Sequence, residues 1–160
     1  MVVAKKTLGA MGGLMLALAG AAHAHRMPEV YITLEDSDLA GEAITAVTLR
    51  LYAEDAIALL SAHDRPVSNL ETRDEHEALA QLSVLALTIE GGPLSFLGGE
   101  VDGRAVLLYL TAPPALEVID SAILSTVYDQ WTNHVTDQTR DGSPDLVFTQ
   151  GGELEHVHRH

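Results

Sequence analysis

The feature that most constrains the fold of this chain is a period-two alternation of apolar and polar residues in short segments. Between Glu29 and Glu35, the apolar Val30, Ile32 and Leu34 alternate with polar residues, which is the pattern of a strand with one buried face. Further strand-like segments lie at 43–52, 84–89, 94–101, 104–110, 118–128, 134–136 and 146–149. Turn residues separate them, as at 36–38, 91–93, 102–103 and 141–144. We therefore predict a mainly β fold, an antiparallel β-sandwich of about seven or eight strands.

Two segments between the second and third strands predict short inserted helices. The first runs to His63 with Asp55 as its N-cap. The second runs over 69–82, because Ser68-Asn69-Leu70-Glu71 has the spacing of a capping box. Its apolar stripe is thin, so we expect it to lie on the surface with His76 on a solvated face. In the strand at 43–52, the inward positions change parity between Ala46 and Val47, which indicates a bulge or burial on both faces.

The first 24 residues have the pattern of a cleavable export signal. Lys5 and Lys6 form a charged start, residues 14–19 are apolar, and Ala22-His23-Ala24 is an A-x-A cleavage site. The alternative is an uncleaved anchor, but the apolar stretch is at the short limit for a ~30 Å hydrocarbon core. We divide the chain into a signal peptide at 1–24, a β-sandwich domain at 25–152 and a His-rich tail at 153–160, and we predict a periplasmic or secreted protein.

Composition limits the chemistry and the partners of this chain. There is no cysteine, so disulfides, thiol chemistry and lipoprotein acylation are excluded. The formal net charge is −14, and after removal of the signal only arginines would remain as fixed cations in the side chains. Such a surface repels nucleic acid and anionic lipid headgroups. We expect no nucleic-acid partner and no stable membrane insertion after cleavage, and we expect a cation or another exported or inner-membrane protein as partner.

Three segments resemble an exported bacterial domain family of unknown function. They are Arg50–Leu60, Tyr128–Val135 and Leu146–Thr149. In that family a His at the mature N-terminus opens the first strand, an acidic helix follows the second, and a D-Q-x-N-like segment precedes the last. Here two residues instead of one separate Asp129-Gln130 from Asn133. The resemblance covers His25 to about Gly151 and implies an exported, sandwich-like domain without catalytic residues to carry over.

Histidines are the candidate metal ligands. Cleavage after Ala24 would give His25 a free α-amine beside its imidazole, a chelate suited to copper, whereas cleavage after Ala22 would place His25 third from the terminus. His156, His158 and His160 alternate, so in an extended chain their imidazoles face the same way and could hold copper or zinc. His134, close to Trp131 in the sequence, could line a pocket.

No catalytic motif is present, neither a G-x-S-x-G elbow, a P-loop, a G-x-G-x-x-G segment nor H-E-x-x-H. The acidic stretch 141–145 could offer oxygens to Ca²⁺ but is better explained as a turn. We therefore expect no enzyme but a soluble exported binding or accessory module of unknown ligand. The alternative is a periplasmic copper- or zinc-binding protein that uses His25 with one or more of His134, His156, His158 and His160; a hydrolase is a distant third.

Overall fold

The computed structural model describes residues 26–151 and the backbone of residues 155–157. The elements follow one another as β1 (Glu29–Leu39), β2 (Glu42–Tyr52), α1 (Ala53–Ala62), α2 (Arg73–Leu85), β3 (Leu87–Glu90), β4 (Ser95–Asp102), β5 (Ala105–Ala112), β6 (Glu117–Ser121), β7 (Thr132–Asp137), β8 (Asp145–Thr149) and β9 (Glu155–Val157). The two helices lie between β2 and β3, as the sequence predicts.

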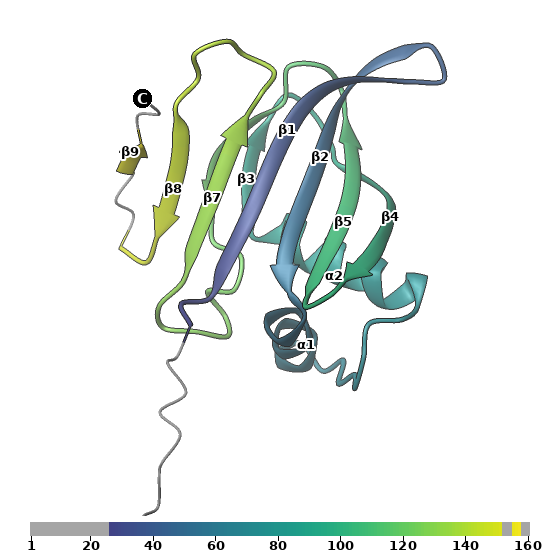
Figure 1. Ribbon diagram of the computed structural model, residues 1–160, viewed down its shortest axis with the longest axis vertical. Coiled ribbons are helices and arrows are strands. Elements are labelled where there is room, and N and C mark those ends of the chain that lie inside the picture. Colours follow the sequence, from purple (N-terminus) through teal and green to yellow (C-terminus); the bar gives the residue numbers. More distant parts are fainter. Residues whose placement is uncertain (1–25, 152–154, 158–160) are drawn as a thin grey trace, which may run out of the picture.

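The strands form one large sheet and one small sheet (Figure 1). The large sheet has the order β4-β5-β2-β1-β7-β8-β9, and β3 pairs with β6 in the small one. The prediction of a mainly β, sandwich-like fold with two helices is confirmed. The sheet is mixed rather than purely antiparallel, because β1 and β7 run parallel, and there are more strands than predicted.

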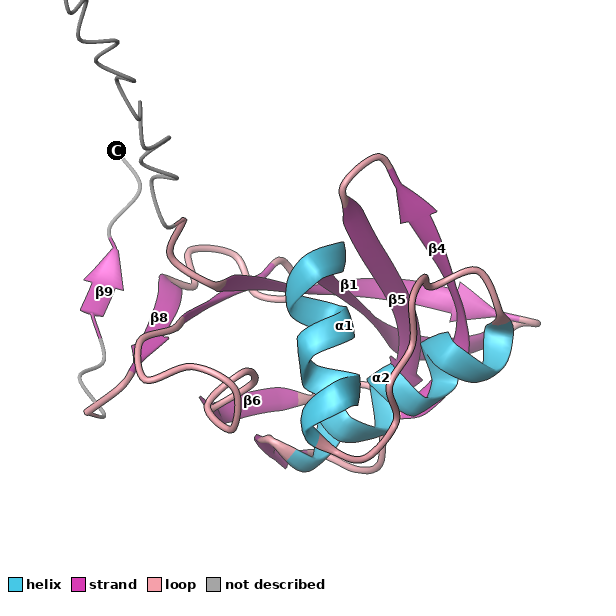
Figure 2. Ribbon diagram, turned by 90° about the horizontal axis from the view of Figure 1, so that it is seen from below, coloured by secondary structure: helices cyan, strands magenta, loops and turns pink. Residues whose placement is uncertain are grey.

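One face of the large sheet is covered and the other is open. Figure 2 shows α1, α2 and β6 on the same side of the sheet. The core lies between these layers, and the inward side chains of β1 and β2 are almost fully buried: Val30, Ile32, Leu34, Val47, Leu49 and Leu51. No described element packs on the opposite face, which we call the open face.

The first hairpin is longer than its turn residues indicate. Asp36 and Asp38, predicted to form a turn, lie in β1 and pair with Thr45 and Ala43 of β2. The turn follows at Ala40–Gly41, where both residues have positive φ. The β1–β2 register has no shift, so the bulge, one of the two alternatives for this strand, is absent. The inward positions of β2 run without a change of parity through Thr45, which is fully buried. Pairing with a neighbouring strand has overridden the local turn preference.

The helix starts differ from those predicted. Tyr52 is the N-cap residue of α1, and Asp55 lies inside the helix, buried. The capping box of α2 is formed by Thr72 and Glu75, which have the same four-residue spacing as the predicted box. Because two such motifs follow each other in the sequence, spacing alone could not distinguish them.

Two predicted strands are shorter in the structure. The segment from Val84 begins in α2, which continues to Leu85 before β3 starts at Leu87. The strand predicted over 118–128 ends at Ser121, and turns follow in which the buried Leu124 has a φ of 74°. An apolar segment buried in a compact connection has the same composition as a strand. Within the described part of the chain, no helix has both the length and the apolar character needed to cross a membrane.

Candidate functional site

The open face carries a row of aromatic and cationic side chains across three strands. Tyr31 of β1 pairs with His134 of β7 on one side and with Arg50 of β2 on the other. The rings of Tyr31 and His134 are stacked, with centroids 4.7 Å apart and an interplanar angle of 8°. Two residues after Arg50, Tyr52 projects from the same face, since alternate residues of a strand share a face. We call His134, Tyr31, Arg50 and Tyr52 the open-face ladder.

Arg50 is the central cation of the ladder. Its guanidinium carbon lies 5.8 Å from the ring centroid of Tyr31 and 5.4 Å from that of Tyr52. Both distances are within the range of a cation–π interaction. Among the described residues no carboxylate lies within 4.0 Å of this guanidinium, although the chain has 23 acidic residues. Arg50 therefore keeps its hydrogen-bond donors available for a ligand.

Arg26 fixes the start of the described chain at the lower end of the ladder. Its guanidinium carbon lies 3.6 Å from the ring centroid of Tyr52, and its Nη2 donates to Asp55 Oδ2 over 2.7 Å. The hydroxyl of Tyr128 donates to Asp55 Oδ1 over 3.0 Å. Burial, together with the hydrogen bond and negative charge of Asp55, raises the pKa of Tyr128 to about 12. Asp55 thus joins α1, the N-terminal segment and the loop before β7.

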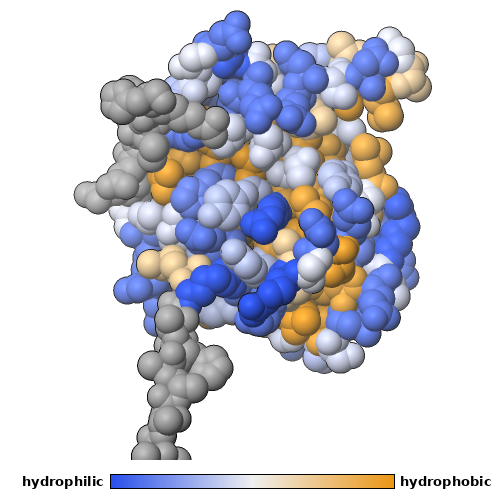
Figure 3. Space-filling view, viewed as in Figure 1, coloured by the Kyte–Doolittle hydropathy of each residue, from blue (hydrophilic) through white to orange (hydrophobic). Residues whose placement is uncertain are grey.

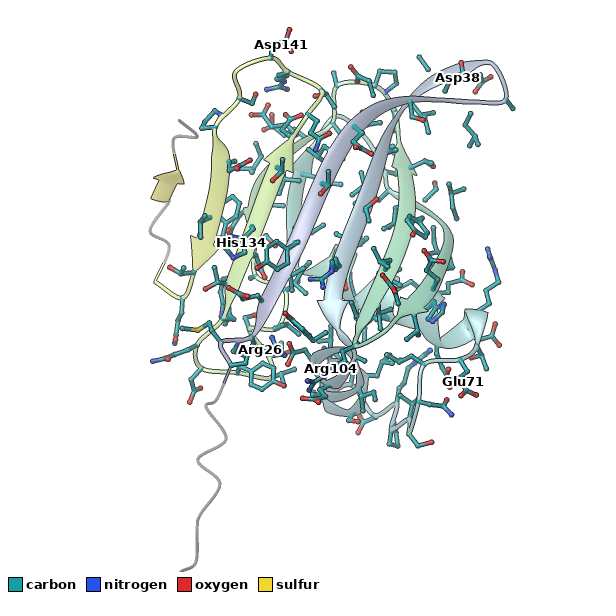
Figure 4. The ribbon with its side chains drawn as sticks, in the orientation of Figure 1. Arg26, Asp38, Glu71, Arg104, His134 and Asp141 are labelled. Carbon is teal, nitrogen blue, oxygen red and sulfur yellow. The ribbon has the colours of Figure 1, made fainter. Side chains whose placement is uncertain are left out.

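Glu29 borders the ladder at its other end. Its Oε2 accepts a hydrogen bond from the Tyr31 hydroxyl over 3.1 Å, and its Oε1 lies 3.5 Å from His134 Nε2. Burial and the hydrogen bond to Glu29 raise the pKa of Tyr31. The His134 Nε2 atom is buried without a hydrogen-bond partner. Figure 4 shows His134 and Arg26 on the same side of the sheet, above one another.

His134 and Trp131 lie on opposite faces of the sheet. Trp131 is buried in the core, whereas His134 projects from the open face. The reason is the strand period: residues three apart in an extended segment point to opposite faces. The prediction that His76 is solvated is wrong, because only 6% of this residue is exposed.

Surface chemistry on the open face is mixed. Figure 3 shows hydrophilic and hydrophobic side chains interspersed there instead of one continuous apolar surface. Three of the four tyrosines of the chain, Tyr31, Tyr52 and Tyr109, project from this face. The hydroxyl of Tyr109 donates to Glu100 Oε1 over 2.5 Å, and this hydrogen bond raises its pKa.

A groove lies at the other edge of the sheet, between β4, α1 and the connection from α1 to α2. Its volume is about 560 Å³. His76 lines it from α2, Gly99 from β4, and Glu71 from the connection. In Figure 4 Glu71 lies at the lower end of the molecule, far across the sheet from His134. The groove and the open-face ladder are therefore separate surfaces.

Of the predicted metal ligands, the structure places only His134 with its side chain. His25, His158 and His160 lie outside the described residues, and for His156 only the backbone is described, in β9 opposite Leu146 of β8. Within the described part of the chain no three His, Asp or Glu side chains are grouped so that they could hold a metal ion.

The sequence reasoning missed Arg50, Arg26, Asp55 and Tyr128. A signal for Arg50 was present, because Arg50 and Tyr52 occupy the outward positions of a strand whose inward positions are apolar. The Asp55 contacts join positions 29 and 73 residues apart, so no local pattern reveals them. Comparisons with protein-family models, with curated proteins and with solved structures find no match.

Proposed function

We propose that this protein is an exported, non-catalytic accessory module that binds a partner protein through its open face. The observation that carries the proposal is Arg50, a cation held between two tyrosine rings with no carboxylate partner among the described residues. Tyr and Arg are the residue types that, with Trp, dominate binding energy at protein interfaces. A face that concentrates them and packs on nothing within the described chain has the composition of such an interface.

The partner would present a carboxylate to Arg50. A guanidinium forms bidentate hydrogen bonds with a carboxylate, and contact with the tyrosine rings restricts the orientation of its plane. The partner is expected to be another exported or inner-membrane protein. The rest of the surface is strongly acidic, so it disfavours nucleic acid and anionic lipid at this face.

Site-specific photo-crosslinking in the native cells tests this function. A photoreactive residue replaces Thr48, which lies next to Arg50 on the open face, and a control replaces Gln81, which is exposed on α2 in the opposite layer. The expected result is one defined adduct from position 48 that is absent from position 81, is competed by unlabelled protein and disappears with Arg50→Ala. Equal adducts from both positions, or an adduct from position 48 that persists with Arg50→Ala, would contradict the proposal.

Export is tested separately by the intact mass of the protein recovered from cells. Removal of residues 1–24 predicts a chain that begins at His25. Retention of the full-length mass in the cytoplasmic fraction would refute the export part of the proposal and leave the open face to be tested on its own.

A further inference from the structure

The outer edge of β4 has no strand paired to it within the described chain. β4 is the outermost strand on the side of the large sheet away from β9, and it pairs only with β5 (Figure 1). Asp102 and Ala105 close a two-residue turn between these strands, so their pair is hydrogen-bonded. The alternation of an antiparallel ladder then directs the backbone groups of Gly99 and Val101 outward. Such an edge is a template for a further strand.

Only part of this edge is available for pairing. At one end a bulge lies between Phe96 and Gly98, and Arg73 of α2 donates a hydrogen bond to the carbonyl oxygen of Leu97 over 2.9 Å. A bulge and a charged side chain both hinder strand pairing. No backbone hydrogen bond from outside β4 and β5 reaches residues 98–102 within the described chain. We call residues 98–102 the free edge.

On its covered side the free edge borders the groove between β4, α1 and the connection from α1 to α2. Val101 faces this side, because it pairs with the fully buried Val106, yet 46% of Val101 is exposed. Ile57 of α1 and Leu70 of the connection also line the groove, whose volume is about 560 Å³. A strand added at the free edge would therefore place apolar side chains in a groove with apolar walls.

On the open side the free edge carries two carboxylates. Glu100 and Asp102 alternate with Gly99 and Val101, so they project from the opposite side of β4. Both carboxylates are exposed, and Glu100 accepts the hydrogen bond of Tyr109 through only one of its oxygens. The two sides of the free edge thus differ: one is apolar and the other is acidic.

The arginines close to the free edge are engaged by other groups. Besides its hydrogen bond to Leu97, Arg73 lies with its guanidinium carbon 5.1 Å from the ring centroid of Phe96. Arg104, in the turn after β4, pairs with Glu54 over 3.1 Å. Among the described residues no arginine forms an ion pair with the carboxylates of the free edge. These carboxylates therefore remain available to a basic ligand.

The same carboxylates disfavour a second copy of the chain as the occupant. Antiparallel pairing of two β4 edges about Glu100 would place this residue opposite its equivalent in the other copy. Pairing about Val101 would place Glu100 opposite Asp102. Like charges that lie directly opposite each other destabilise a strand pair. The free edge therefore suits a different segment, with basic residues on its open side.

We propose that the free edge of β4 binds an extended segment of a partner protein in which basic and apolar residues alternate. The backbone of the segment pairs with residues 98–102, its basic side chains face Glu100 and Asp102, and its apolar side chains enter the groove beside Val101. In this mode of recognition main-chain hydrogen bonds supply affinity and the alternate side chains supply specificity. The contact is separate from the open-face ladder and stands or falls without it.

Three capped peptides test the proposal on the purified protein, with amide chemical shifts to measure and locate binding. KVKVK has the alternation, KKKVV has the same composition and charge without it, and EVEVE has the opposite charge. KVKVK is expected to bind at residues 98–102 about tenfold more tightly than KKKVV, and EVEVE is expected not to bind. Equal affinities for KVKVK and KKKVV, no saturable binding of KVKVK, or shifts centred elsewhere would overturn the proposal. Shifts of residues 98–102 that depend on protein concentration without peptide would assign the free edge to a second copy instead.

Methylation of the amide nitrogens of KVKVK tests whether its backbone pairs with β4. Only one edge of an added strand faces β4, and the lysines and valines direct their N–H groups to opposite edges. One peptide is methylated at the valine nitrogens and the other at the lysine nitrogens. One of them should lose affinity about tenfold or more, and the other should stay within about threefold of KVKVK. Equal effects of the two methylations would overturn the proposal.

Two double variants with the same change of charge separate the free edge from general electrostatic attraction. Glu100→Gln with Asp102→Asn removes both carboxylates of the free edge, whereas Glu77→Gln with Asp74→Asn removes two from the exposed surface of α2. The affinity for KVKVK should fall about fivefold or more in the first double variant and change less than about twofold in the second. Equal losses in both double variants would overturn the proposal.

Discussion

Replacement of Tyr128 by Phe tests whether the buried Asp55 carboxylate joins the N-terminal segment, α1 and the loop before β7. The substitution removes only the hydroxyl that donates to Asp55 Oδ1 over 3.0 Å. The acceptor is charged, and its side chain is only 5% exposed, so water cannot readily take the place of the lost donor. Hydrogen bonds to charged groups contribute about 1.5–3 kcal/mol. We expect the free energy of unfolding to fall by about this amount.

The matched control is Tyr109→Phe. This hydroxyl donates to Glu100 over a shorter distance, 2.5 Å, but the Glu100 carboxylate is exposed and solvent can replace the donor. We expect a loss of less than about 0.5 kcal/mol. If the length of the hydrogen bond decided its contribution to stability, Tyr109→Phe would be the more destabilising substitution. If burial of the acceptor decides this contribution, Tyr128→Phe is the more destabilising substitution.

Urea unfolding of the wild type and both variants at neutral pH distinguishes these cases. With an m-value of about 2 kcal/mol/M, the midpoint of Tyr128→Phe should lie about 1 M below that of the wild type. The midpoint of Tyr109→Phe should lie within about 0.3 M of it. Equal midpoints for the two variants would refute the argument that burial of Asp55 gives this hydrogen bond its strength.

Four further predictions concern pH, packing, metal binding and processing. The pKa of Tyr128 is raised to about 12 from an unfolded value of about 10, so its stabilising contribution is complete below pH ~10 and is lost as the pH rises through 12. The difference in unfolding free energy between wild type and Tyr128→Phe should therefore shrink over that range of pH. A difference that stays constant would contradict this prediction. Gly99→Ala places a Cβ 2.9 Å from His76 Nδ1 and should lower the free energy of unfolding, measured in urea, by about 1–3 kcal/mol. An unchanged free energy of unfolding would show that the His76 side chain can move away from the added Cβ. The copper-binding alternative is tested by Cu(II) affinity in a chelator competition. His134→Gln should leave the affinity unchanged, since this imidazole is stacked on a tyrosine ring, whereas an extra residue before His25 should lower the affinity. A loss of affinity with His134→Gln and none with the extra residue would place the metal at His134. Intact mass should show a mature chain that begins at His25, and a start at His23 would shift the chelate to the alternative terminus.

The sequence was sufficient to predict the individual strands with strong alternation. The inward residues of β1, and those of β2 from Val47 onward, were identified correctly, whereas earlier in β2 the inward residue is Thr45 and not Ala46. The two helices were placed between the correct strands. Where local preference and tertiary pairing disagreed, the prediction failed: Asp36 and Asp38 have turn propensity, yet β2 holds them in a strand. The parallel pairing of β1 with β7 joins segments about a hundred residues apart, and no local pattern contains that information.

The candidate site was only partly predictable for the same reason. His134 was chosen for its type and for its neighbour Trp131, but the two residues lie on opposite faces of the sheet. The sequence indicates that Arg50 and Tyr52 share the outward face of a strand, but it does not reveal the ring of Tyr31 beside Arg50 or the absence of a nearby carboxylate within the described chain. His76 looks solvated among its charged neighbours, and only the position of β4 against α2 buries it.

Radical footprinting of tyrosines in native cells, compared with the purified protein, tests most directly whether the open face is a binding surface. Tyr31 is 37% exposed in the free chain and should be labelled in purified protein, whereas Leu85 is 83% exposed in the opposite layer and provides the internal reference. If a partner covers the open face, labelling of Tyr31 relative to Leu85 falls in cells and returns to the purified level with Arg50→Ala. Equal relative labelling of Tyr31 in cells and in purified protein would contradict the claim that a partner covers the open face.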